Sequence, residues 1–148
     1  KKEPTQSIQL MSYVGKFLPI YSTALGKVLI YKKSNEEIRE LIGTTLDPLT
    51  EYTIKDIDLF LEEMEKVKSR GYSYDNQETS LDARCVAVPI EKDNKVIAAI
   101  SVSVPTFRSS EEKLNSILEI LLKYKNKIED SFGYSIFKNE DLIWKIKY

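Results

Sequence analysis

The chain has 148 residues, enough for one ordinary domain built on a single hydrophobic core. Its 22 basic and 23 acidic residues give a net charge of −1, which excludes a domain-wide positive field that would attract DNA or a membrane surface. One cysteine excludes an internal disulfide. The sequence contains neither a signal peptide nor an apolar run of about 18–20 residues, so we expect a cytoplasmic protein with no membrane partner.

The first predicted element is a short strand near the start of the chain. Ser7–Val14 has the composition of a strand, with Leu10 on one of its sides. Pro19 separates this strand from a predicted helix. Ser22 or Thr23 can cap the first turn of that helix.

The predicted helix runs to Ile30, and its first turn is a candidate binding element. The backbone amides of Ala24, Leu25 and Gly26 have no partner inside the helix, and such a terminus attracts anions. An ordinary capped helix with no ligand explains the same residues.

Two further helices are predicted before the middle of the chain. Ser34 and Glu37 form a capping box that opens a short helix reaching about Ile42. The segment Thr53–Asp56 opens a longer helix that ends at Gly71. Its apolar residues recur at three- and four-residue spacing and are expected to pack against a sheet: Ile57, Phe60, Leu61, Met64 and Val67.

A β-hairpin is predicted in the centre of the chain. Cys85–Ile90 and Val96–Val104 are rich in β-branched residues and flank a polar turn at Lys92–Lys95. Because side chains repeat every second residue, small residues gather on one face of each strand, where a core would hold larger ones. These residues are Ala83, Cys85 and Ala87 on the first strand and Ser101 and Ser103 on the second.

A last helix is predicted after Pro105. Its capping signature lies at Ser109–Glu112, and leucines and isoleucines at helical spacing continue to Ile128. Helices combined with an antiparallel sheet predict a two- or three-layer α+β domain.

Two motifs resemble one known family. RGYSYDNQETSLDARCVAVPI, followed by AAISVSVP, and the earlier GKFLPIYSTALGKVLI are similar to the effector-binding domain of IclR-type transcriptional regulators. The resemblance runs in order from about Ser7 to Glu129. It implies a curved antiparallel sheet flanked by helices, related to GAF and profilin-like folds.

The end of the chain departs from the family's order. Residues 131–148 read as a second hairpin with a turn at Lys138–Asp141. In the family such a hairpin comes first. We therefore divide the chain into a core at 1–130 and a hairpin at 131–148 that supplies the first two strands of the same sheet, a permuted order. An added hairpin that only resembles the missing one is the alternative.

The resemblance also implies a binding site. Matched position by position, the ligand-contacting residues are Leu10, Ala24, Leu25, Asp75, Ala83, Cys85, Ser101 and Ser103. Helix amides and serine hydroxyls donate hydrogen bonds, and Asp75 accepts them. This set suits a small organic acid that also carries a hydroxyl or ammonium group.

Several side chains near this site have alternative interpretations. Asp75 can instead cap Gln77 or nearby amides. Cys85 cannot form a Cys–His catalytic site because the chain contains no histidine. It also lacks the usual companions of a metal ligand, so we expect no metal and no cofactor, and interpret it as a small buried residue. We expect Arg84 to pair with an acid such as Glu78 or Asp82.

The resulting hypothesis is a non-enzymatic sensor domain of an IclR-type regulator. We expect a homodimer or tetramer that contacts DNA only through a winged-helix module, which is not within these 148 residues. A ligand-free dimerisation module and an enzyme built on the same fold are the alternatives.

Overall fold

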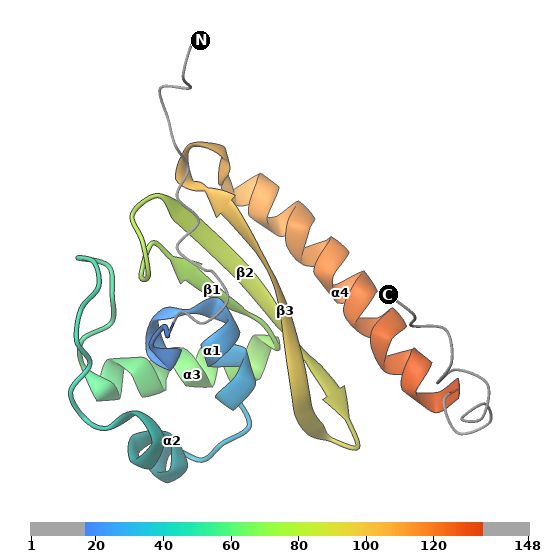
Figure 1. Cartoon of the computed structure of the whole chain (residues 1–148), viewed down its shortest axis with the longest axis horizontal. Helices are drawn as coiled ribbons and strands as arrows, with labels where there is room; N and C mark the ends of the chain where they lie inside the picture. Colours follow the sequence, from blue (N-terminus) through green and yellow to red (C-terminus); the bar gives the residue numbers. More distant parts are fainter. Residues whose placement is uncertain (1–16, 135–148) are drawn as a thin grey trace, which may run out of the picture.

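The computed structural model describes residues 17–134 and contains one antiparallel sheet between two layers of helices. The strands are β1 (Ser73–Asn76), β2 (Ala83–Lys92) and β3 (Lys95–Pro105), in the order β1-β2-β3. Figure 1 shows α1 (Ala24–Ile30), α2 (Asn35–Ile42) and α3 (Ile57–Arg70) on one side of the sheet and α4 (Glu111–Tyr134) on the other. The predicted α+β class is confirmed.

The alternation of β2 separates the two cores. Ala87 belongs to the buried cluster formed with α1, α2 and α3. Its neighbours Val86 and Val88 belong to a second buried cluster, which includes Leu114 and Leu121 of α4. Because successive side chains of a strand point to opposite faces, one apolar run supplies both cores.

The predicted hairpin is confirmed and is longer than expected at both ends. Asp93 and Asn94 connect β2 to β3 with positive φ angles of 50° and 61°. Two consecutive residues of this conformation form the turn that matches the twist of a hairpin, and Asn and Asp tolerate it best. A register shift between Ile90 and Glu91 marks a bulge close to the turn.

The predicted helix starts are also confirmed. The Oγ1 atom of Thr23 accepts a hydrogen bond from the amide of Gly26 at 2.9 Å, and Ser34 and Glu37 form both bonds of a capping box. α3 is capped by Asp56 and ends at Gly71, which has the left-handed φ of 77° expected at this position. A one-turn 3-10 helix (η1, Ile20–Ser22) precedes α1, and another (η2, Thr106–Arg108) precedes α4.

The division of the chain at residues 130 and 131 stays a prediction, but the start of the proposed hairpin segment is helical. α4 continues through Tyr134, so the first four residues of the proposed hairpin segment are helical. The helix continues because Ile128 and Phe132 extend its apolar spacing, and Lys92 lies 5.8 Å from the centre of the Phe132 ring. The rest of that segment, the predicted strand Ser7–Val14 and the permuted pairing lie outside the described residues.

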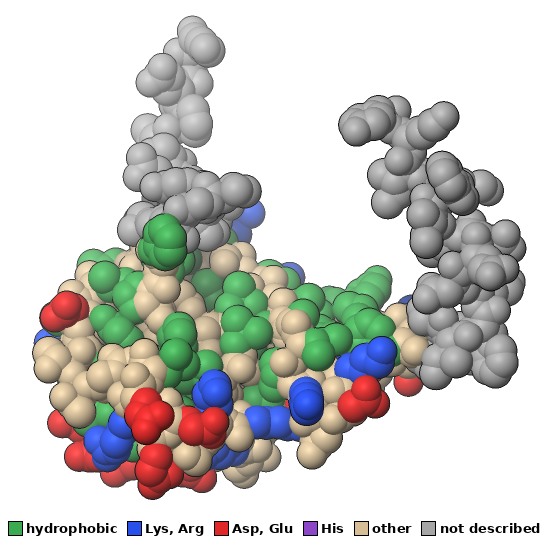
Figure 2. All heavy atoms as spheres, turned by 60° about the horizontal axis from the view of Figure 1, so that its bottom comes forward, with side chains coloured by type: hydrophobic (Ala, Val, Ile, Leu, Met, Phe, Trp, Pro, Cys, Tyr) green, Lys and Arg blue, Asp and Glu red, His purple; other side chains and the backbone are tan. Residues whose placement is uncertain are grey.

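The surface carries charges of both signs. On the face in Figure 2, basic side chains lie beside acidic ones along the lower border of the view. No helix within residues 17–134 is long and apolar enough to cross a membrane.

Candidate functional site

The candidate site begins with a row of side chains across the three strands. Asp75 of β1 pairs with Cys85 of β2, and Cys85 pairs with Ser103 of β3. One step along the sheet on the same face, Ala87 lies between Ser73 and Ser101. The sheet therefore brings together three predicted residues in one row and a fourth, Ser101, in the next.

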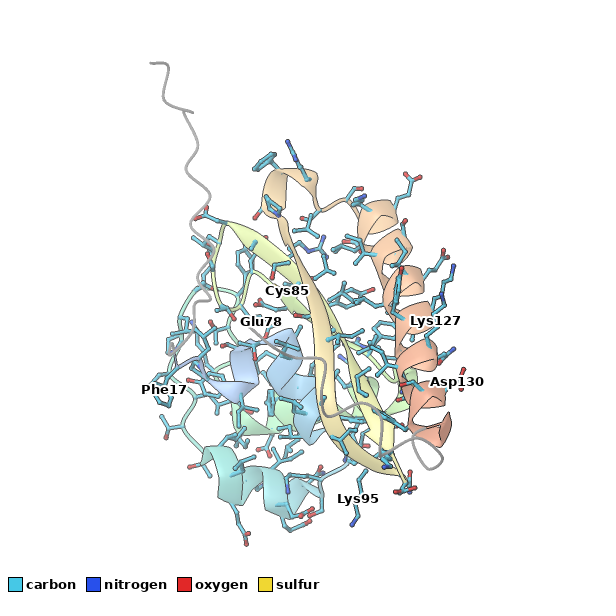
Figure 3. The ribbon with its side chains drawn as sticks, turned by 45° about the vertical axis from the view of Figure 1, so that its right-hand side comes forward. Phe17, Glu78, Cys85, Lys95, Lys127 and Asp130 are labelled. Carbon is cyan, nitrogen blue, oxygen red and sulfur yellow. The ribbon has the colours of Figure 1, made fainter. Side chains whose placement is uncertain are left out.

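The row lies on the face of the sheet that α1 covers. In Figure 3, Cys85 and Glu78 lie on the side of α1, whereas Lys127 and Asp130 lie on α4 beyond the other face. Ala24 is buried at the start of α1, and its carbonyl accepts a hydrogen bond from the Ser73 hydroxyl at 2.6 Å. This bond fixes the first turn of α1 beside β1.

The first turn of α1 differs in one respect from the sequence expectation. The amide of Gly26 already donates to the side chain of Thr23, so the amides of Ala24 and Leu25 are the candidates for a ligand. Leu25 is 38% exposed.

Cys85 has the properties of a neutral thiol. Its Sγ atom lies 3.1 Å from the Oγ atom of Ser103. Burial raises the pKa of Cys85 to about 11, and the nearby Asp75 carboxylate acts in the same direction. Because the thiolate is the reactive form, this thiol suits a binding surface better than nucleophilic chemistry.

Asp75 is buried and holds a turn in place. One carboxylate oxygen accepts hydrogen bonds from the amides of Glu78 at 2.7 Å and Thr79 at 3.2 Å. This is the capping role that the sequence left open. Burial raises the pKa of Asp75, although the bonds from Thr79 and Glu78 and the charge of Lys27 oppose the shift.

This pKa predicts a pH-dependent effect of Asp75→Asn on stability. A carboxyl group whose pKa is raised by folding contributes stability below its unfolded pKa, and this contribution is lost as the pH rises through the folded pKa. The asparagine oxygen can accept the same two amide bonds but cannot ionise. We therefore expect the variant to gain stability relative to the parent chain as the pH rises from about 4 to about 8. Urea unfolding across this range measures the difference, and a difference that does not vary with pH would contradict the prediction.

Two further predicted residues, Ala83 and Leu10, are not part of the row. Ala83 is half-buried at the start of β2, opposite Pro105, on the same face as Cys85. Leu10 lies outside the described residues.

A buried ion pair beside the row was not predicted. The Nζ atom of Lys27 lies 2.5 Å and 2.7 Å from the two carboxylate oxygens of Glu78, and the two residues are only 1% and 6% exposed. The available signal was a lysine within the otherwise apolar helix run ALGKVLI. Its position on the helix face that packs inward could have indicated a buried partner.

Arg84 pairs with an acid as predicted, but the acid is Glu111 rather than Glu78 or Asp82. Its guanidinium bonds Asn76 and the carbonyl of Ser109 and lies 2.8 Å from Glu111. Strand alternation explains the difference, because Arg84 points to the α4 face whereas Glu78 lies on the α1 side.

A separate hollow is lined in part by Glu78. It has a volume of about 300 Å³ and is lined by Tyr52, Ile54, Glu63, Arg70, Tyr74, Asn76 and Glu78. It contains none of the predicted ligand-contacting residues. Within residues 17–134 no group of three or more acidic, cysteine or histidine side chains could hold a metal ion.

An antiparallel sheet whose polar row faces the start of a helix makes this α+β domain a candidate for binding a small molecule. The family described as "Bacterial transcriptional regulator IclR C-terminal" matches residues 1–130. The chain belongs to this family.

One relative is the HTH-type transcriptional regulator KdgR of Escherichia coli (strain K12). It is 35% identical over 136 residues, which are 90% of this chain and 52% of KdgR. The chain thus spans about half the length of the curated relatives it matches.

Two solved structures are similar as well. The C-terminal domain of E. coli KdgR has a TM-score of 0.71 and 38% identity, covering 78% of this chain and 72% of that one. The inducer-binding domain of PobR from Acinetobacter, a double mutant in complex with 3-hydroxybenzoic acid, has a TM-score of 0.75 and 30% identity. That match covers 86% of this chain and 77% of the PobR chain.

Proposed function

We propose that this chain binds a small carboxylic acid bearing a hydroxyl or ammonium group, and that binding is the signal a transcriptional regulator reads. The observation that carries the proposal is the row Asp75, Cys85 and Ser103 on the sheet face that α1 covers. A site this rich in small polar groups leaves space and hydrogen-bonding capacity for a ligand.

The roles follow from the chemistry of each group. The hydroxyls of Ser101 and Ser103 and the backbone amides of Ala24 and Leu25 donate to the ligand carboxylate. One oxygen of Asp75 is engaged by two backbone amides, so its other oxygen accepts from the ligand hydroxyl or ammonium group. Ala83 and Cys85 line the surface between them, and Leu10 supplies an apolar wall.

The complex of the PobR domain with 3-hydroxybenzoic acid supports this ligand class, because that acid carries a carboxylate and a hydroxyl. We propose binding without turnover, in keeping with relatives that are transcriptional regulators. The complete protein would be a cytoplasmic homodimer or tetramer that contacts DNA through a winged-helix module. Ligand binding would shift its population between two states.

Calorimetric titration tests the proposal. The purified chain is titrated with glycolate, pyruvate, alanine, 3-hydroxybenzoate and 4-hydroxybenzoate. We expect saturable binding to at least one acid, weakened at least about tenfold in an Asp75→Ala, Ser101→Ala double variant because each change removes a polar contact.

A matched control keeps the same residue types. Asp130→Ala with Ser116→Ala changes exposed positions of α4, away from the row, and should leave binding unchanged. Failure of the folded chain to bind any acid would overturn the proposal and favour the ligand-free dimerisation module.

A further inference from the structure

The two chain segments that line the site are joined by buried polar contacts. Lys27 and Glu78 are 51 residues apart in sequence, and their side chains meet at 2.5 Å. The Nζ atom of Lys27 also donates to the carbonyl of Tyr74 at 3.0 Å. One lysine from α1 therefore holds both β1 and the turn that follows it.

A second contact joins the same two segments. The hydroxyl of Thr79 donates to the carbonyl of Ser22 at 2.9 Å, just before α1. Together with the Lys27 contacts, this bond fixes the turn at 75–79 against the segment that carries Ala24.

The ion pair is connected directly to a predicted ligand contact. The side chain of Glu78 binds Lys27, while its own backbone amide donates to Asp75 at 2.7 Å. Movement of the Glu78 side chain would thus move the amide that orients the Asp75 carboxylate.

Burying this pair is not the most stabilising choice at such a position. Two charges lose their hydration on burial, and well-packed apolar residues of similar volume stabilise a fold as well or better. The pair instead fixes the relative positions of the two segments that it joins, because charge-assisted hydrogen bonds are short and oriented.

We infer that Lys27 and Glu78 are positioning residues of the effector site, which hold the Asp75 turn and the first turn of α1 at the spacing that the ligand requires. The inference rests on the proposed function, which supplies the class of ligand.

Two variants distinguish a positioning role of the ion pair from a purely stabilising one. Lys27→Met with Glu78→Leu removes both charges and should fold with nearly the parent stability, because the pair is replaced by apolar residues. Glu78→Gln keeps an acceptor for Lys27 but leaves its charge uncompensated, so it should be the less stable of the two. A purely structural role would make ligand affinity follow this order of stability.

We expect affinity to follow the opposite order. With 3-hydroxybenzoate as the probe, Glu78→Gln should bind within about threefold of the parent chain and the apolar double variant at least about tenfold more weakly. The exposed pair of α3 supplies the control, and Lys68→Met with Glu65→Leu should leave affinity unchanged.

A ligand-free measurement tests the inference even if the parent chain does not bind the probe. Amide hydrogen exchange at residues 78 and 79 should be at least about tenfold faster in the apolar double variant than in the parent, while exchange at Val88 in β2 is unchanged. Unchanged exchange at residues 78 and 79 would overturn the inference, as would parent affinity in the stable double variant. Absence of 3-hydroxybenzoate binding by the parent chain counts against the proposed ligand class alone.

Discussion

Replacing Gly26 with alanine is expected to destabilise the chain by about 3 kcal/mol or more. An added Cβ atom would lie 2.2 Å from the carbonyl oxygen of Ile20 and 2.7 Å from its Cα atom. These are backbone atoms of η1 and cannot rotate away, so α1 would have to separate from the segment beneath it. Urea unfolding of the variant and the parent chain measures the loss.

Gly71 provides the comparison. It lies in the left-handed region, with a φ of 77° and a ψ of 13°, and has open space around the added Cβ, so alanine there meets only the left-handed backbone cost of about 1–2 kcal/mol. Equal losses at Gly26 and Gly71 would show that η1 does not pack against α1 as closely as the structure has it. Because α1 begins at Ala24, the same contact also sets the position of the turn that we propose faces the ligand.

Local signals account for the parts of the fold that the sequence predicted correctly. The capping box at Ser34 and Glu37, the glycine that ends α3 and the turn residues Asp93 and Asn94 act over four residues or fewer. Their geometry depends on hydrogen bonds and φ angles within the turn itself, so a short sequence window contains the necessary information.

The site was partly predictable for a similar reason. Alternation places Cys85 on one face of β2, and a hairpin fixes which residue of β3 lies opposite it. The bulge after Ile90 shifts the register, so the pairing of Cys85 with Ser103 required the structure. The alignment of Asp75 with this pair required the position of β1, which no local signal contains.

Long-range electrostatic partners could not be predicted. Lys27 meets Glu78 across 51 residues, and Arg84 meets Glu111 across the α4 face of the sheet. Such pairs depend on which face each element presents after packing. Composition gives the number of charges but not their neighbours.

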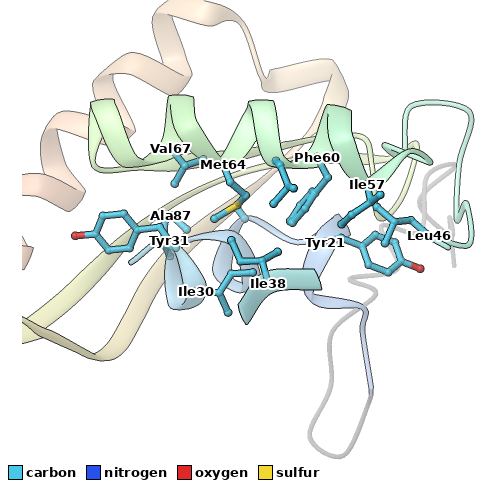
Figure 4. Close-up of a cluster of buried hydrophobic side chains, with 13 residues drawn as sticks. Tyr21, Ile30, Tyr31, Ile38, Leu46, Ile57, Phe60, Met64, Val67 and Ala87 are labelled. Atoms are coloured by element: carbon cyan, nitrogen blue, oxygen red, sulfur yellow. The ribbon is translucent and has the colours of Figure 1, made fainter. Parts of the chain in front are cut away.

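Replacing Phe60 with alanine is expected to cost about 3–5 kcal/mol, because it removes a fully buried aromatic side chain and leaves a cavity. Phe60 of α3 lies in the cluster of Figure 4, which joins α3 to α1, α2 and Ala87 of the sheet. A loss of this size is a large fraction of the stability of an ordinary domain. Thermal and urea unfolding measure it.

The preceding residue in the same helix provides the control. Leu59 is 57% exposed, and Leu59→Ala should change stability by no more than about 0.5 kcal/mol. Equal effects at the two positions would contradict the packing of α3.

The Phe60 cavity has a second consequence, because Ala24 and Val28 of α1 belong to the same cluster. Loosening this cluster frees α1 from the sheet, so Phe60→Ala should also weaken ligand binding although Phe60 is not among the predicted ligand contacts.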